Sequence, residues 1–302
     1  MKALISQYGD KSCSKILAAA LECQWRHGFP HTPKGVLAYT AGFHPYMAGL
    51  QLSSVRMVLP LLTMPRGGCL LDPFAGSGTT LVEGTAQGLQ VIGSDLSPLA
   101  AFISANHTWR PDDSDLARLR SVANDVATKA LVEIYKNESS ESGLAAWSPL
   151  CVVLHEQSSH EAQDDANAPL SEHKRDDLRR LWFCLSAAIS KLGRRMPKAR
   201  KLSPSDCLVT FLDSVDNYST RIDTLAAAAK EATKASGRPQ LPAHPEVYLG
   251  DARSLLDFAP HLSDPKNPGW GVVDGILSSP PYVSTTNRRA FQCSDAYATC
   301  TV

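Results

Sequence analysis

The stretch Leu70–Leu81, LLDPFAGSGTTL, places an acid, a proline and two spaced glycines directly after a short apolar run. Before Asp72, GGCLL has the character of a buried strand, and after Gly78, TTLVEGTAQ has that of a helix stopped by Gly88. A second apolar run, LQVIGSD, ends at Asp95, and a further helix, PLAAFISANH, follows it. The order strand, glycine turn, helix, strand and acid predicts a right-handed βαβ unit, and therefore an α/β fold.

The glycine turn lacks the marks of two common phosphate-binding turns. A P-loop requires a lysine directly after its last glycine, and no lysine lies between Arg66 and Arg110. A dinucleotide turn requires a third glycine at the position that Leu81 occupies. Asp95 lies 23 residues after Asp72, close to the spacing of about 20 at which an acid binds ribose hydroxyls. The turn therefore predicts an adenosine site that needs no pyrophosphate.

Composition is that of an ordinary globular protein. The 302 residues are 43% hydrophobic and 20% charged, with 30 basic and 30 acidic side chains. The first fifteen residues break their apolar run early, so we expect neither a signal peptide nor a membrane span there. The eight cysteines form no CxxC pair and no cluster with metal spacing. We therefore expect a reduced, cytoplasmic protein without a metal site.

Asp72–Thr80, DPFAGSGTT, resembles the S-adenosylmethionine signature of the DNA amino-methyltransferases, which modify exocyclic amines of cytosine or adenine. A glycine-rich turn of another α/β protein is the alternative. The resemblance implies S-adenosyl-L-methionine as cofactor and a Rossmann-like methyltransferase sheet with helices on both faces. It gives cofactor-binding roles to Asp72, Pro73, Phe74, Gly76, Ser77, Gly78, Thr79 and Asp95.

A second motif, SSPPY, follows the apolar run VVDGILS, and its two prolines end that predicted strand. It resembles the catalytic loop of the same family, although a proline turn next to an aromatic residue is common in isolation. The implied catalytic residues are Ser279, Pro280, Pro281 and Tyr282. The Ser279 hydroxyl and the Pro280 carbonyl would accept hydrogens of the target amine and restore its lone pair, and Tyr282 would stack on a base extruded from the duplex.

The first residue of this loop bears on the substrate. In the family, serine at this position is associated mainly with cytosine-N4 methylation and aspartate with adenine-N6 methylation. Ser279 therefore favours the N4 amine of cytosine in DNA. Two alternatives stay open: a catalytically inactive or partner-dependent fragment that binds cofactor or nucleic acid, and an adenine-N6 DNA or guanine-N2 RNA methyltransferase.

Two further segments agree with the family less specifically. EVYLGDARSLL is strand-like and turns at Gly250-Asp251, where the family places an acidic or polar loop near the cofactor adenine, so that the resemblance implies Asp251 and Ala252 as further cofactor-binding residues. FHPYMAGL, which contains Tyr46, resembles the segment that closes over the methionine end of the cofactor. Packing explains the aromatic residues of that second segment equally well.

The chain between Asp95 and Asp251 is far longer than one crossover helix requires. We predict a mainly helical insertion, residues 113–239, between the catalytic parts 43–112 and 240–302, with an N-terminal helical extension at 1–42. Within the insertion we expect Ser114 to cap a helix and residues 143–170 to form a polar loop or linker.

A basic segment ends the middle of this insertion. Residues 171–201 contain ten Lys and Arg against three acids, and GRRMPKARK contains no acid. Contact with the phosphate backbone of double-stranded DNA is the functional interpretation, and a solvated face is the alternative. The insertion would then recognise the target. The predicted DNA-binding residues are Arg194, Arg195, Lys198, Arg200 and Lys201.

The end of the sequence bears on the sheet. Only 20 residues follow Tyr282, whereas the family adds three more strands after its catalytic loop. We expect the last strands of the sheet to be missing, so that the sheet edge is open and a complementing subunit finishes the domain. A restriction endonuclease is a further candidate partner, and no membrane partner is expected.

Overall fold

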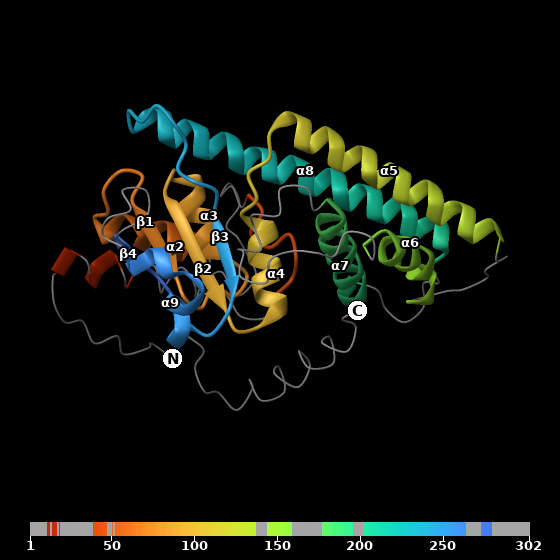
Figure 1. The fold of residues 1–302 in the computed structure, drawn as a ribbon, viewed down its shortest axis with the longest axis horizontal. Helices are drawn as coiled ribbons and strands as arrows, with labels where there is room; N and C mark the ends of the chain where they lie inside the picture. Colours follow the sequence, from red (N-terminus) through yellow and green to blue (C-terminus); the bar gives the residue numbers. More distant parts are fainter. Residues whose placement is uncertain are drawn as a thin grey trace.

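The fold is known from a computed structural model (Figure 1). The structure describes residues 11–12, 14–16, 18, 39–46, 50, 52–136, 144–158, 177–195, 202–263 and 273–279. Among these residues, no helix is both long and apolar enough to span a membrane.

Four parallel strands form the sheet of the described part of the chain. They are β1 (Cys69–Asp72), β2 (Gln90–Asp95), β3 (Glu246–Leu249) and β4 (Gly275–Ile276), in the order β3-β2-β1-β4. This order begins a doubly wound sheet, in which the direction of winding reverses between β1 and β4. The predicted α/β, Rossmann-like fold is confirmed.

Helices cover both faces of the sheet, as predicted. On one face, the 3-10 helix η1 (Leu59–Leu62), α3 (Thr79–Ala86) and α4 (Pro98–His107) pack on the strands, and α2 (Leu52–Val58) packs on α3. On the other, α9 (Leu255–Phe258) and the 3-10 helix η4 (Pro260–Ser263) pack on the strands. Because side chains alternate along a strand, Leu70 lies in the first core and Leu71 in the second.

Close packing of α3 on the sheet depends on a glycine one turn into the helix. A Cβ at Gly84 would lie 2.7 Å from Val91 Cγ1 and 2.8 Å from Leu70 Cδ2. The third glycine of a dinucleotide turn permits such an approach, and here Leu81 stands at that position, fully buried. Gly84 supplies the same close approach three residues later.

The described part of residues 113–235 contains four helices that run away from the sheet and return to it (Figure 1). They are α5 (Asp113–Lys136), α6 (Ser148–Ser158), α7 (Asp177–Arg195) and α8 (Pro204–Ala235), with the 3-10 helix η2 (Ala145–Trp147) before α6. Their buried side chains join Val82 of α3 and Ile103 of α4 in one apolar cluster. The domain boundaries at 113 and 239 stay a prediction, because this core crosses them.

Two local predictions for the insertion are wrong. Residues 148–158 form α6 instead of a polar loop, because Trp147, Leu150 and Leu154 recur at helical spacing and are buried. At the start of α5, Asp112 and not Ser114 caps the helix: its Oδ1 accepts a hydrogen bond of 2.8 Å from the amide of Asp115.

Candidate cofactor and catalytic site

The glycine turn crosses from β1 to α3 at the carboxyl edge of the sheet. Gly76 and Gly78 have φ values of +54° and +78°, which an L side chain adopts only with strain. Ser104 of α4 donates from Oγ to the Gly76 carbonyl over 2.8 Å, and a Cβ at Gly78 would lie 3.1 Å from that residue. The turn is therefore held against α4, and both the positive φ and the close approach of Ser104 disfavour a larger residue at Gly78.

The carboxylate of Asp95 fixes the same turn from the end of β2. Its Oδ2 accepts a hydrogen bond of 2.9 Å from the Gly76 amide, and its Oδ1 accepts one of 2.8 Å from the Ser97 amide. Each carboxylate oxygen can accept a second hydrogen bond. Asp95 is thus fixed in orientation and retains acceptor capacity toward a ligand.

Asp72 lies beneath the turn and connects β1 to the end of β4. Its side chain is buried, and its Oδ1 accepts hydrogen bonds from Ser278 Oγ (2.6 Å) and from the Phe74 amide (3.1 Å). Burial raises the pKa of the Asp72 carboxyl above its usual 3.8, the two hydrogen bonds oppose this shift, and the charge of Asp95 adds to it. Sequence reasoning assigned no role to Ser278.

The other residues of the motif lie around this turn. The Pro73 carbonyl accepts a hydrogen bond from Ser94 Oγ, Phe74 is 38% exposed at the rim, and Thr79 begins α3 with its hydroxyl 3.3 Å from that of Ser77. Their predicted contact with a cofactor stays a prediction.

The SSPPY motif begins at the carboxyl end of β4, next to β1. The observed strand is shorter than the predicted run VVDGILS: β4 comprises Gly275–Ile276. The Leu277 amide donates a hydrogen bond to the Leu71 carbonyl over 3.2 Å, so the backbone stays next to β1 beyond the end of β4. Ser279 is partly buried, and Pro280, Pro281 and Tyr282 lie outside the described residues.

Tyr46 belongs to the same edge of the sheet. Burial raises the pKa of its phenol, the nearby charge of Asp95 raises it further, and a hydrogen bond with Ser97 opposes both. The structure therefore brings Tyr46 next to the residue predicted to bind ribose.

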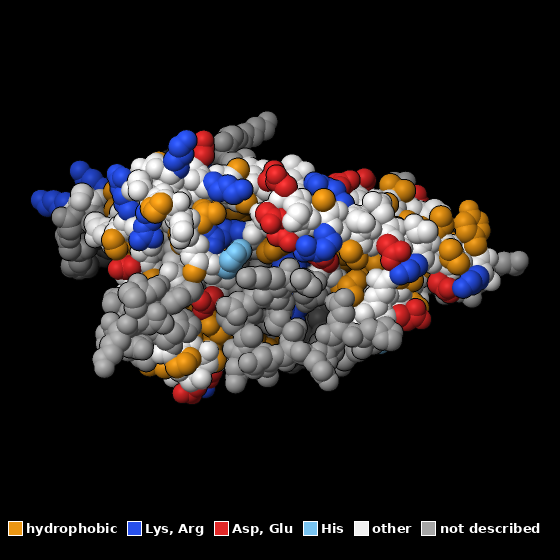
Figure 2. Space-filling model, turned by 45° about the horizontal axis from the view of Figure 1, so that its top comes forward, with side chains coloured by type: hydrophobic (Ala, Val, Ile, Leu, Met, Phe, Trp, Pro, Cys, Tyr) orange, Lys and Arg blue, Asp and Glu red, His pale blue; other side chains and the backbone are white. Residues whose placement is uncertain are grey.

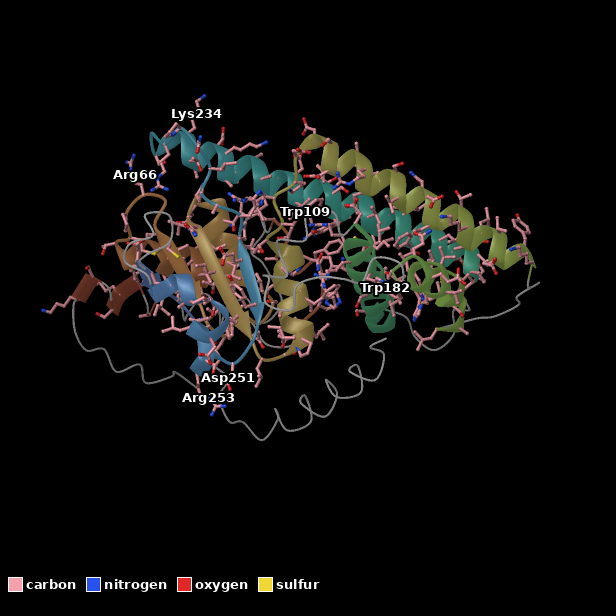
Figure 3. The ribbon with its side chains drawn as sticks, in the orientation of Figure 1. Arg66, Trp109, Trp182, Lys234, Asp251 and Arg253 are labelled. Carbon is pink, nitrogen blue, oxygen red and sulfur yellow. The ribbon has the colours of Figure 1, made fainter. Side chains whose placement is uncertain are left out.

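Asp251 and Ala252 follow β3 at this edge. The Gly250 amide donates to the Asp95 carbonyl over 3.0 Å, so the turn after β3 lies next to the end of β2. The Asp251 carboxylate accepts hydrogen bonds from the side chain and the amide of Arg253, which lower the pKa of Asp251 to about 2. Figure 3 shows Asp251 and Arg253 at the end of the sheet opposite Arg66 and Lys234.

The predicted DNA-binding residues are only partly within the described chain. Arg194 and Arg195 end α7, and Lys198, Arg200 and Lys201 lie outside the described residues. On the face in Figure 2, basic and acidic side chains are interspersed over α5 and α8. Lys129 and Asp125, for example, form an ion pair of 2.6 Å. This face alone does not indicate a surface for DNA.

Sequence reasoning missed one buried polar residue of the site, His107, the last residue of α4. Its Nδ1 lies 2.7 Å from the Ser77 carbonyl oxygen. A histidine in the apolar helix PLAAFISANH was the available signal, since a buried polar side chain requires partners. Among the described residues, no group of three or more His, Cys, Asp or Glu side chains is arranged to hold a metal.

Comparison with known proteins finds a similarity to a methyltransferase. Over 91 residues the chain is 38% identical to the type II methyltransferase M.MvaI of Kocuria varians, a match that covers 30% of this chain. The chain spans about a fifth of that relative's length. No protein-family model and no solved structure matches.

The hydrogen bond between Asp72 and Ser278 gives a prediction in two variants. Replacing Ser278 with alanine removes the hydroxyl from a buried carboxyl, and we expect the free energy of unfolding to fall by about 1.5–3 kcal/mol.

A raised pKa means that the stability contributed by Asp72 is fully present below pH 3.8 and is lost as the pH rises through the raised value. The free energy of unfolding of the Asp72→Asn variant should therefore increase relative to that of the native chain as the pH rises from 3.8 through the raised pKa of Asp72.

Urea unfolding of the native chain and both variants at several pH values measures these effects. If the difference in free energy of unfolding between Asp72→Asn and the native chain did not change with pH, burial would not raise the pKa of Asp72. An unchanged midpoint in Ser278→Ala would show that the hydrogen bond contributes nothing.

Proposed function

We propose that this chain is a DNA methyltransferase that transfers a methyl group from S-adenosylmethionine to the exocyclic N4 amine of cytosine. The observation that carries the proposal is that the two motifs begin close together, at the carboxyl ends of β1 and β4. The glycine turn after β1 and the first two residues of the SSPPY motif, Ser278 and Ser279, lie side by side where the winding of the sheet reverses, and Asp72 and Ser278 are hydrogen-bonded. In open α/β sheets, ligands bind at that crevice.

The residues at this edge suit the adenosine part of the cofactor. Asp95 offers acceptor capacity for two ribose hydroxyls, and the turn at Gly76–Gly78 allows the backbone to approach a ligand closely. Tyr46 and Asp251 lie at the same edge as further cofactor contacts. S-adenosylmethionine supplies the activated methyl group. Asp72 supports the turn by accepting a hydrogen bond from the Phe74 amide.

The catalytic loop would act on the amine that receives this methyl group. Ser279 Oγ and the Pro280 carbonyl accept the hydrogens of the amine, so that its lone pair is no longer delocalised into the ring. Tyr282 stacks on the base, which has left the duplex. Positioning supplies most of the rate, because direct attack needs no covalent intermediate on the enzyme. Ser278, fixed by Asp72, holds the start of this loop next to the cofactor turn.

Partners follow from the substrate. Double-stranded DNA would contact the basic segment after α7, and the insertion would select the target. A complementing subunit and a restriction endonuclease are further proposed partners. Cys69, Cys184 and Cys207 are free thiols, which suits the cytoplasm.

A methyl-transfer assay tests the proposal. The purified chain is incubated with radiolabelled S-adenosylmethionine and either double-stranded DNA or tRNA, and the labelled nucleoside is identified. We expect N4-methylcytosine in DNA. Label in N6-methyladenine or only in RNA would assign another substrate. Cofactor binding without transfer would indicate a fragment that requires a partner or is inactive.

Replacing Asp95 tests the placement of the cofactor. Calorimetry should show that Asp95→Ala binds S-adenosylmethionine about 10- to 100-fold more weakly, because hydrogen bonds to a charged acceptor are removed. Asp257→Ala, on an exposed part of α9, is the matched control. Unchanged affinity in Asp95→Ala would mean that the site lies elsewhere.

The basic segment gives a second prediction for this function. Replacing Arg194, Arg195, Lys198, Arg200 and Lys201 with glutamine should weaken DNA binding and flatten its salt dependence, by about 0.9 in slope for each phosphate that the variant no longer neutralises. A titration at several salt concentrations measures the slope. Lys129→Gln with Lys136→Gln, on exposed α5, is the control. If the salt dependence of DNA binding were unchanged in the five-residue variant, the basic segment would be a solvated surface that does not contact DNA.

A further inference from the structure

His107 connects two segments that are distant in sequence. It is fully buried at the end of α4. Nδ1 lies 2.7 Å from the carbonyl oxygen of Ser77, in the glycine turn, and Nε2 lies 3.4 Å from the amide nitrogen of His44, in the segment 39–46. The His107 carbonyl also accepts a hydrogen bond from Thr40 Oγ1. One residue thus contacts the turn through one ring nitrogen and the segment that carries Tyr46 through the other.

The two ring partners determine the tautomer. The His44 amide can only donate, so Nε2 of His107 must be the acceptor. The Ser77 carbonyl can only accept, so the proton lies on Nδ1. The ring must therefore be neutral, and burial lowers the pKa of His107 to about 3, in agreement. A protonated ring would direct a second N–H at the His44 amide and break that contact.

Helix α7 completes the surroundings. The ring of Phe183 meets His107 edge-on at 5.3 Å and stacks on His44 at 5.6 Å. His44 Nε2 lies 2.9 Å from Ser186 Oγ. Both histidines are thereby held between the sheet and the helical insertion.

We propose that His107 is a positioning residue for the cofactor site, which holds the glycine turn and the Tyr46 segment in a single arrangement. This inference rests on the proposed function. Packing explains why a side chain fills this place. It does not explain why each ring nitrogen contacts a different segment at the edge where Asp95 lies. When the Ser77 carbonyl loses its donor, the peptide between Ser77 and Gly78 is no longer fixed on its α4 side, and cofactor affinity falls.

Two conservative variants separate the two contacts. In His107→Asn, the amide nitrogen stands near the position of Nδ1 and can donate to Ser77, but nothing reaches the His44 amide. In His107→Gln, the amide oxygen stands near Nε2 and can accept from His44, but the donor to Ser77 is absent. His155→Asn, on the exposed side of α6, is the control.

The measurements are calorimetric affinity for S-adenosylmethionine, hydrogen exchange of residues 39–46, and steady-state methyl transfer. We expect His107→Gln to raise Kd and KM for the cofactor about tenfold with kcat changed less than about threefold. His107→Asn should keep affinity within about threefold of the native chain and speed exchange in residues 39–46. Nitrogen NMR of labelled histidine should show the Nδ1–H tautomer for His107 in the native chain.

The outcomes distinguish this inference from the proposed function. A native chain that binds no cofactor overturns both. A native chain that binds it, with folded Asn and Gln variants that bind equally well, overturns the inference and leaves the function in place. Equal losses in both variants would also overturn it, because a residue that only fills space makes no distinction between the two nitrogens. Circular dichroism checks that each variant is folded.

Discussion

A buried carboxyl joins parts of the chain that lie 206 residues apart. Asp72 ends β1 and accepts a hydrogen bond from Ser278 at the end of β4. A carboxyl with so little contact with water requires such partners, since an unpaired charge in an apolar interior is strongly unfavourable. The pair holds Ser278, the first residue of the SSPPY motif, next to the glycine turn. Without it, β4 would be held to β1 by two paired residues, flanking backbone hydrogen bonds and the hydrogen bond from the Cys69 amide to the Asp274 carboxylate.

The helical insertion is not an appendage of the sheet. Its buried side chains form one cluster with α3 and α4, and Tyr218 of α8 donates to the Asn106 carbonyl over 2.6 Å at the end of α4. Phe183 of α7 contacts His44 and His107 directly. A region proposed to bind the target therefore packs on α4, the helix that contacts the glycine turn through Ser104 and His107.

Sequence predicted those parts of the site that depend on local structure. The turn, β2 and Asp95 follow from apolar runs and glycines within 26 residues, and a parallel βαβ unit brings them to one edge. The roles of Ser278 and His107 depend on which residues meet across the fold, and no local pattern contains that information. Helix α6 was missed because the polar stretch after Gln157 obscured the spacing of Trp147, Leu150 and Leu154.

A crystal structure of the chain with S-adenosylhomocysteine tests the central claim most directly. The account predicts that the ribose hydroxyls lie on the Asp95 carboxylate, that the turn at Gly76–Gly78 lies against the ligand, and that the sulfur faces Ser279. A ligand bound away from the carboxyl edge of β1 and β2, or one that leaves Asp95 without contact, would contradict it.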